Sequence, residues 1–447
     1  MKKLEKILFY LFLFLIPLQL RATISWQGSE WDSIFLYLTD LLLIGFLFFA
    51  IINKRISFKK TDILLFLFLG LAGVSLFASS DLGNSVYRFI KLLEFVLLFV
   101  YVSKTHKSYM TNRTYTVLIA AGVLQSVLAI CQFFKQSSLG LRFIEAGTYA
   151  PGAPGVATFI MGDNKIMRAY GSFPHPNVLA VFLLLAIFAF YAIWLTGRIR
   201  PIGPIGLIGL IFALFLTFSR GPILIFLIIS FLFLIIRLFQ LRPLYHTEER
   251  LLAGKRLMIL SALFVVSSLI SVIVLSPYIK ARFFTLSLQE EAIDLRFFYN
   301  KMALSIIKDK PFLGIGIGNF VNFSHNYPVF LRAANAMLAG GGGADVKIPE
   351  WVYQPVHNLY LSIASEIGIL GALLFLFFLA KTIIRPIRLI SPIGFLFLGF
   401  LILALSDHLF WTLQSGGIIF WLSLALLGNP NYSKIQTISN QARNPNV

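Results

Sequence analysis

Apolar runs long enough to cross a lipid bilayer recur along almost the whole chain. A membrane-spanning helix needs about 17–25 largely apolar residues, because the hydrocarbon offers no water to exposed backbone groups. Of the 447 residues, 58% are hydrophobic and only 13% are charged, which is about half the charged fraction of a soluble protein. The sequence therefore predicts an all-α polytopic integral membrane protein.

About twelve segments have the length and composition of membrane spans. The first resembles a signal peptide, but no small-residue cleavage site follows it, so we interpret it as a span. We expect a single membrane domain over residues 1–447, with spans at about 7–20, 33–52, 62–79, 86–103, 114–134, 174–196, 202–218, 221–239, 258–276, 358–380, 393–408 and 416–428.

The distribution of basic residues predicts the orientation of these spans. The chain carries a formal net charge of +19. Most lysines and arginines fall in alternate short connections, which the positive-inside rule assigns to the cytoplasm. Both termini, including the tail 429–447, are then cytoplasmic. The long connections 135–173 and 277–357 lie outside, and 277–357, between spans nine and ten, is expected to be an extracytoplasmic loop subdomain with amphipathic helices.

Other kinds of site find little support. The single cysteine, Cys131, cannot form an internal disulfide, so the redox compartment stays open. Gly314, Gly316 and Gly318 resemble a nucleotide-binding loop, but they follow no strand and precede no clear helix, so they predict a turn. No cluster of Asp or Glu with His suggests a metal. We therefore expect neither a metal nor a cofactor.

Polar residues gather where three expected spans begin on the outer side. His175, Arg220 and His357 stand at the outward N-termini of spans six, eight and ten, and Asn177 is a candidate cap of span six. Helix N-termini carry partial positive charge and free N–H groups. If these ends converge, they form a cationic anion-binding site at the outer membrane boundary.

Each of these residues also has a structural interpretation. Capping explains the prolines and Asn177 of "GSFPHPNVLA", and snorkelling to lipid phosphate would explain Arg220. Arg296 lies off the apolar stripe of an amphipathic helix that we expect to rest on the membrane surface, from which it could reach the site. The stripe comprises Leu295, Phe298, Met302 and Ile306.

The chemistry of such a site follows from its residue types. Two arginine forks match the oxygens of a diphosphate, and a neutral histidine beside them can take a proton from a hydroxyl nucleophile. His357 is the candidate base. Glu366, nine residues further along the same expected helix, points to the other side and is interpreted as a structural, ion-paired carboxylate.

A resemblance adds the substrate. The set "FSRG", "RFFYNKMALSIIKDKPFLGIGIGNF", "HNLYLSIASEIGILG" and "GSFPHPNVLA" resembles the O-antigen ligase and O-antigen polymerase superfamily over about residues 170–375. The resemblance implies an inverting, metal-independent glycosyltransferase of surface polysaccharide (lipopolysaccharide or exopolysaccharide) biosynthesis. It would move a glycan from an undecaprenyl-diphosphate carrier to a lipid-linked or lipid-anchored acceptor hydroxyl.

The same resemblance suggests roles for particular residues. Arg220 and Arg296 match the arginines that hold the diphosphate, and His357 matches the histidine that activates the acceptor. His175 matches no essential family position. His175, Asn177, Asn358 and Arg282 complete the expected substrate-binding set.

Several alternatives stay open. Polymerase and ligase differ only in the acceptor. A transporter or flippase of lipid-linked glycans would concentrate polar residues at the bilayer midplane, whereas here they gather at one boundary. A peptidoglycan-type glycosyltransferase would use a carboxylate base in the outer loop. The expected location is the bacterial cytoplasmic (inner) membrane of the cell envelope, with no nucleic-acid partner.

Overall fold

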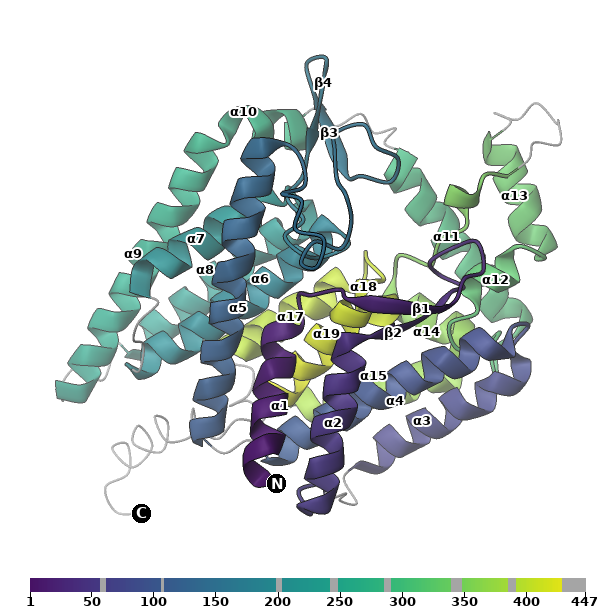
Figure 1. Cartoon of the computed structure of the whole chain (residues 1–447), viewed down its shortest axis with the longest axis horizontal. Helices are drawn as coiled ribbons and strands as arrows, with labels where there is room; N and C mark the ends of the chain where they lie inside the picture. The colour runs from purple at the N-terminus through teal and green to yellow at the C-terminus, as the bar shows by residue number, and fades with distance from the viewer. Residues whose placement is uncertain are drawn as a thin grey trace.

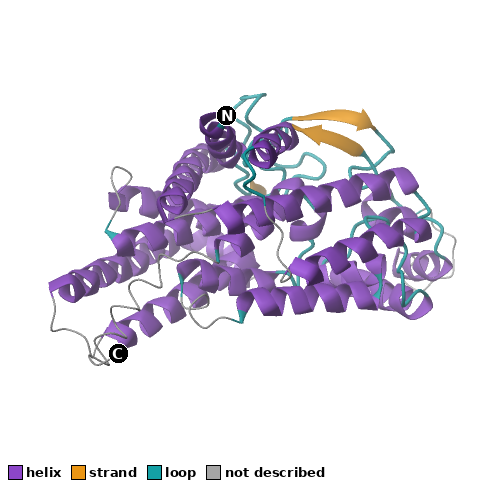
Figure 2. Ribbon diagram, turned by 90° about the horizontal axis from the view of Figure 1, so that it is seen from below, coloured by secondary structure: helices purple, strands orange, loops and turns teal. Residues whose placement is uncertain are grey.

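The computed structural model describes residues 1–56, 62–105, 108–197, 203–241, 248–284, 291–338, 348–384 and 391–427. Helices dominate this part of the chain (Figures 1 and 2). The expected tail 429–447 and parts of several expected inner connections lie outside the described residues. The long N-terminal and central helices are α1 (Lys2–Leu15), α2 (Leu38–Ile52), α3 (Ile63–Ser75), α4 (Leu82–Thr105), α5 (Ser108–Lys135), α6 (Pro176–Thr196), α7 (Gly203–Leu216), α8 (Arg220–Leu241) and α9 (Glu248–Val274).

The second half contains shorter elements. They are α10 (Ser276–Ile279), η4 (Lys280–Phe284), α11 (Glu291–Asp309), α12 (Phe320–Ser324), α13 (Pro328–Leu338), η5 (Glu350–Val352), α14 (Leu359–Ile367), α15 (Ile369–Ile383), α17 (Pro392–Leu403), α18 (Leu409–Thr412) and α19 (Gln414–Leu426). A short helix, η2 (Leu76–Ala78), extends α3.

Among the residues that the structure describes, four helices are long and apolar enough to cross a membrane: 110–135 within α5, α6, 220–240 within α8, and 251–274 within α9. Six further apolar helices or helix pairs are shorter, at 10–17 residues. Each expected span contains at least one helix, but the number of membrane crossings stays a prediction. The molecule is a mostly helical protein with the apolar helices of an integral membrane protein.

Two small hairpins correct the all-α expectation. Strands β1 (Arg21–Ser25) and β2 (Ile34–Tyr37) pair antiparallel, as do β3 (Thr158–Met161) and β4 (Asn164–Met167). β2 occupies the start of the expected span 33–52, so the helix there begins only at Leu38. The Tyr37 backbone N–H donates to Asp40 Oδ2 at 2.8 Å, which caps the helix at that point.

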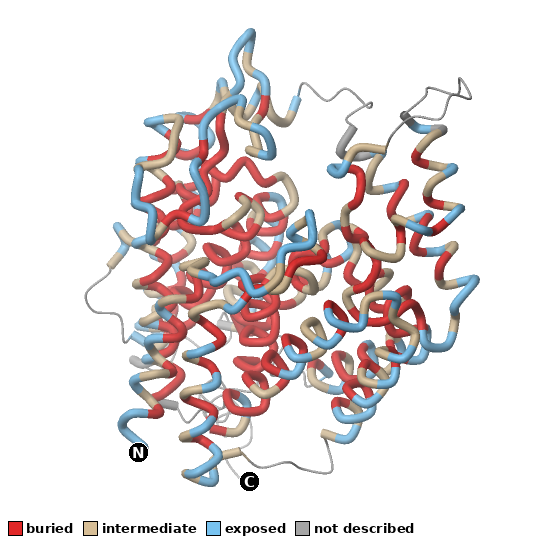
Figure 3. Tube along the Cα trace, turned by 45° about the vertical axis from the view of Figure 1, so that its right-hand side comes forward, coloured by how far each residue is buried: buried red, intermediate tan, exposed pale blue. Residues whose placement is uncertain are grey.

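Helix α6 forms the centre of the main core. Almost all of its side chains are buried, and it is apolar on every side. Figure 3 shows the buried residues concentrated inside the helical bundle. α6 packs against α5, α7, α8, α9, α17 and α19. Packing on several sides thereby fixes the position of its N-terminus.

The segment that follows α9 contains a second core. Phe298, Met302 and Ile306 of α11 are buried against residues of α12, α13 and the stretch before α14. The expected apolar stripe therefore packs within the protein, which corrects the prediction that this stripe rests on the membrane surface. The physical reason is that α13 and the 352–356 stretch supply apolar partners for it.

Expected span 358–380 is broken in two. α14 ends at Ile367, and Gly368 has φ +87°, which ordinary side chains rarely adopt. A Cβ on Gly368 would lie 2.0 Å from the Phe312 carbonyl oxygen. The turn of the glycine run Gly314, Gly316 and Gly318 packs against this break, with Gly314 against Ser365 and Glu366. The run is thus a packed turn, as expected.

Candidate active site

One cavity of about 550 Å³ collects polar residues from helix ends and loops far apart in the sequence. Helix ends leave backbone groups and side chains unpaired within the helix, so they are the natural place for such a site. Its charged and imidazole side chains are Glu30, Arg168, His175, Arg220, Arg282, Arg296, His357, Asp407 and His408.

The turn between α7 and α8 positions the first arginine. Phe218 adopts a left-handed φ of 45°, an uncommon conformation for a non-glycine residue, and reverses the chain directly before Arg220. Arg220 opens α8, and its Nε and Nη2 donate to the Arg282 carbonyl oxygen at 3.2 and 2.6 Å. This contact brings η4 and α8 together, so two guanidinium groups line the same cavity.

Arg168 is a further arginine of the cavity, and the sequence patterns did not indicate it. Its Nε donates to the Thr217 carbonyl at 2.7 Å, and its Nη2 donates to Asn177 Oδ1 and Ser219 Oγ, both at 2.8 Å. Burial, followed by the nearby charges of Arg282 and Arg220, lowers the pKa of Arg168 to about 9. It therefore remains cationic at neutral pH, beside two other arginines.

The N-terminus of α6 differs from the expectation. His175, not Asn177, is the N-cap: its Nδ1 accepts from the Asn177 backbone N–H at 3.1 Å. Pro176 occupies the first helical position, where its fixed φ fits and its missing N–H is not needed. The Asn177 side chain is therefore free to accept from Arg168 and to donate from Nδ2 to Asp407 Oδ2 at 2.9 Å.

Asp407 and His408 lie in the cavity because α17 ends at Leu403, before the expected end of span eleven at residue 408. The Leu409 backbone N–H donates to Asp407 Oδ1 at 3.1 Å. The His408 ring meets the His357 ring edge to face, with centroids 4.5 Å apart. An adjacent Asp–His pair at the end of an apolar run was the signal that could have identified them.

His357 is held on two sides. Its ring stacks on Tyr299 of α11, with centroids 5.6 Å apart, and its Nδ1 lies 3.1 Å from the Pro355 carbonyl oxygen. A carbonyl accepts only, so Nδ1 carries the proton and Nε2 keeps its lone pair. Burial, and then the neighbouring His408, lowers the pKa of His357 to about 3. The ring is neutral at physiological pH.

The structure brings together six of the seven predicted site residues. His357, Arg220, Arg296, His175, Asn177 and Arg282 all line the cavity. Asn358 does not line it. Its Oδ1 caps α14 by accepting from the Tyr360 and Leu361 N–H groups, and its Nδ2 donates to the Leu405 carbonyl at 3.1 Å. Its polar atoms are thus used in the fold.

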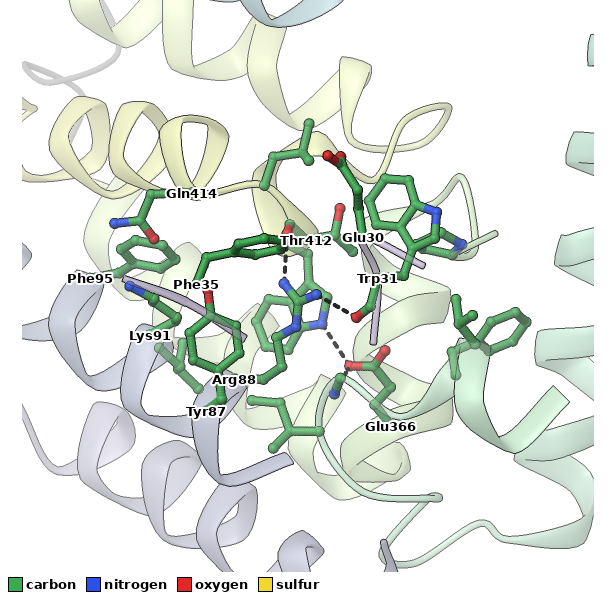
Figure 4. A pocket seen from close by; sticks show the side chains of 18 of the residues that line it. Glu30, Trp31, Phe35, Tyr87, Arg88, Lys91, Phe95, Glu366, Thr412 and Gln414 are labelled. Atoms are coloured by element: carbon green, nitrogen blue, oxygen red, sulfur yellow. Dashed lines mark hydrogen bonds between the residues drawn. The ribbon is translucent and has the colours of Figure 1, made fainter. Parts of the chain in front are cut away.

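Glu366 lies apart, beside a smaller cavity of about 60 Å³ (Figure 4). Its Oε2 accepts from Trp411 Nε1 and from the Gly318 N–H, both at 2.8 Å. These donors are uncharged, which corrects the expected ion pair. The carboxylate fastens the glycine-run turn to α14, so its structural interpretation holds with different partners.

Charge is unevenly balanced in the large cavity. Four arginines face two carboxylates, Glu30 and Asp407, so the described lining carries an excess of two positive charges when the histidines are neutral. Among the residues that the structure describes, no three His, Cys, Asp or Glu side chains are grouped as metal ligands.

The fold and the cavity thus define a class: a helical membrane protein with a cationic cavity that contains histidines and lies at its helix ends. Residues 205–376 match the family model described as O-antigen ligase. This part of the chain is an O-antigen ligase family domain, and the protein is an enzyme of the glycosyltransferase class. The match includes Arg220, Arg282, Arg296 and His357, whereas His175 and Asn177 precede it. The chain matches no curated protein.

Proposed function

We propose that the protein transfers a glycan from an undecaprenyl-diphosphate carrier to an acceptor hydroxyl in surface polysaccharide assembly. One observation carries the proposal: a single cavity contains four arginines beside a histidine whose Nε2 can accept a proton. The O-antigen ligase family match supports the same class of reaction. The reaction occurs at the outer face of the cytoplasmic membrane, with both termini inside.

The arginines bind the donor diphosphate. A diphosphate that links a lipid to a sugar carries two negative charges, which equal the excess positive charge of the described cavity lining. Guanidinium forks bind phosphate oxygens through two parallel hydrogen bonds. Arg220 and Arg296 hold the diphosphate, and Arg282 and Arg168 add positive charge beside them.

His357 activates the acceptor. Its Nε2 takes the proton of the acceptor hydroxyl as that oxygen forms a bond to the anomeric carbon of the donor sugar. The bond between this carbon and the diphosphate oxygen breaks on the opposite side, so the configuration inverts. The lipid diphosphate leaves with one more negative charge, which the arginines stabilise in the transition state. The proton stays on His357 until release, and no step requires a metal.

Two other functions agree less well with these observations. A transporter or flippase of lipid-linked glycans would not need a histidine held in one tautomer, and the glycosyltransferase family match favours catalysis. A peptidoglycan-type glycosyltransferase would use a carboxylate as base. The cavity does contain Asp407, but this carboxylate already accepts from Asn177 and Leu409.

The decisive experiment incubates purified full-length protein with one lipid-linked glycan repeat and no other acceptor. Growth of glycan chains identifies a polymerase. Product that forms only after a lipid-anchored core glycan is added identifies a ligase. Absence of transfer to either acceptor would overturn the proposal. A parallel reaction with a chelator should proceed at the same rate, and activity that requires an added metal would contradict the metal-free mechanism.

A further inference from the structure

The turn between β1 and β2 contributes two residues to the large cavity, Glu30 and Trp31. Both also line the smaller cavity, where Figure 4 shows them, so the two cavities share these residues. The turn precedes the O-antigen ligase family match and has no role in the proposed reaction so far. Because the turn lines the cavity of the proposed reaction, we consider a role for it other than diphosphate binding and proton transfer.

Hydrogen bonds and an ion pair hold the turn in place. Arg88 Nη2 donates to the Trp31 carbonyl oxygen at 2.7 Å, and its Nη1 donates to the Thr412 carbonyl at 2.9 Å. Arg21 forms an ion pair with Glu30. The Trp31 side chain also packs against the second core. The indole is therefore a fixed surface and is preorganised for a ligand.

Trp31 stands close to the proposed base. Its ring meets His408 edge to face at a centroid distance of 5.3 Å, and His408 meets His357 in the same way at 4.5 Å. The three rings are thus consecutive neighbours. Apart from the histidines, Trp31 is the one aromatic side chain among the described residues that line the large cavity.

Three of the cavity arginines form hydrogen bonds that do not involve the three rings. Arg282 contacts Arg220, while Arg168 contacts Asn177, which in turn contacts Asp407. Arg168, Arg220 and Arg282 thus cluster around the starts of α6 and α8. The rings of Trp31, His408 and His357 lie together at the β1–β2 turn and the starts of α18 and α14, and Arg296 of α11 acts on both histidines. A phosphate suits the first group. A sugar suits the second, because an indole packs against the C–H face of a pyranose and a carboxylate accepts from its hydroxyls.

We propose that Trp31, with Glu30, forms the subsite for the sugar that carries the accepting hydroxyl. The inference rests on the proposed function, because that sugar must lie beside His357 for its hydroxyl to lose a proton there. Trp31 supplies the apolar platform that orients the ring, and Glu30 accepts from a hydroxyl at the rim. Together they select which acceptor hydroxyl reaches Nε2.

The test uses the acceptor that gives product in the incubation described above. Initial rates are measured over a range of acceptor concentrations at saturating lipid-linked donor, and then with donor and acceptor exchanged. Trp31→Ala should raise the KM for the acceptor about tenfold and leave the KM for the donor unchanged. Trp31→Phe, which keeps an aromatic face, should recover most of the loss.

Trp26→Ala is the matched control, because Trp26 lies in the same hairpin connection, is 58% exposed and lines neither cavity. It should behave like the wild type. A second readout avoids turnover: binding of undecaprenyl diphosphate, which lacks sugar, should be the same for Trp31→Ala and the wild type.

The outcomes separate the two proposals. If the wild type neither transfers glycan nor binds undecaprenyl diphosphate, the proposed function is wrong. If the wild type is active but Trp31→Ala keeps its acceptor KM, or instead raises only the donor KM, the acceptor subsite is wrong. A fall in kcat alone with unchanged KM values would likewise overturn it, since that pattern indicates displacement of His408 and His357.

Discussion

His357 is the residue on which the proposed chemistry depends, because its Nδ1 faces the Pro355 carbonyl and its Nε2 is left as the proton acceptor. His357→Ala should lower the rate of transfer about 10²–10⁴-fold, the usual contribution of a general base. Binding of undecaprenyl diphosphate should persist. His325→Ala is the control, because His325 stacks on Tyr353 and does not line the cavity. Near wild-type transfer by His357→Ala would remove the base assignment.

The pH dependence follows from the same residue. Burial and His408 lower the pKa of His357 to about 3 in the free protein, although Asp407 opposes the shift. The neutral base is then present throughout the mildly acidic range, so the acid limb of kcat/KM should lie well below pH 6.5. A half-maximal kcat/KM between pH 6 and 7 would contradict this.

Stability should change in the same pH range. The unfolded chain takes a proton on this histidine below about pH 6.5, whereas the folded protein does not until near pH 3. The unfolded state therefore binds more protons, and the free energy of unfolding falls as the pH drops from about 6.5 towards 3. Thermal unfolding of the purified protein at pH 7.5 and 5 measures this fall.

Arg220 is expected to act on affinity. Arg220→Ala removes a guanidinium from the diphosphate site, and a hydrogen bond between charged groups contributes about 1.5–3 kcal/mol. Binding of undecaprenyl diphosphate should weaken about tenfold to a hundredfold, and more so at low salt. Arg237→Ala, near the other end of α8, should bind normally. Equal affinity of Arg220→Ala and the wild type would exclude Arg220 from the diphosphate site.

The sequence indicated the residues that stand at recognisable helix starts, and it failed for those defined by tertiary contacts. Arg220 and His357 were expected because prolines, glycines and caps mark span ends. Arg168 could not be distinguished, because it is one arginine in a long loop and only its contacts with Thr217, Ser219 and Asn177 bring it to the cavity.

Among the elements, the break between α14 and α15 has the clearest consequence for stability. The apolar run 358–380 predicts one continuous helix, and nothing in its hydropathy marks Gly368 as a break. A Cβ there would meet the Phe312 carbonyl at 2.0 Å, and φ is +87°. Gly368→Ala should therefore destabilise the protein and detach the glycine-run turn.

The melting temperature of purified Gly368→Ala, measured with its transfer activity, tests this. Gly70→Ala is the matched control: Gly70 lies in α3 with no atom within 4 Å of the added Cβ. A Gly in mid-helix is less stable than Ala by roughly 0.5–1 kcal/mol, so this control should keep or raise the melting temperature. If the helix instead continued through residue 368, Gly368→Ala and Gly70→Ala should change the melting temperature equally, and that result would contradict the break.

Other element boundaries show why sequence alone fell short. The apolar run 393–408 predicts a helix that ends with Asp407 and His408, whereas α17 ends at Leu403 and releases both into the cavity. Likewise, α11 was correctly predicted to be amphipathic. What covers its apolar stripe was not predicted, because α13 and the 352–356 stretch are distant from it in sequence. Hydropathy identifies an apolar face and does not identify what covers it.

For the whole molecule, the positive-inside pattern gave an orientation that can be tested by labelling. Asp163→Cys places a thiol in the turn between β3 and β4. In a Cys131→Ser background, this thiol should react with an impermeant maleimide from outside intact cells. A cysteine at the exposed Lys3 should react only after the membrane is opened. The reverse pattern would invert the topology and move the cavity to the cytoplasmic side.

The buried helix α6 also has a consequence for how the protein is made. Its partners α8, α9, α17 and α19 are all synthesised after it. Because α6 is apolar on every side, it can enter the lipid before those partners exist and does not need to keep one face from the acyl chains. Its final surroundings are completed only when α19 emerges. A nonsense mutation after α15 would therefore yield a chain in which α6 inserts normally but stays exposed to lipid where α17 and α19 would have covered it.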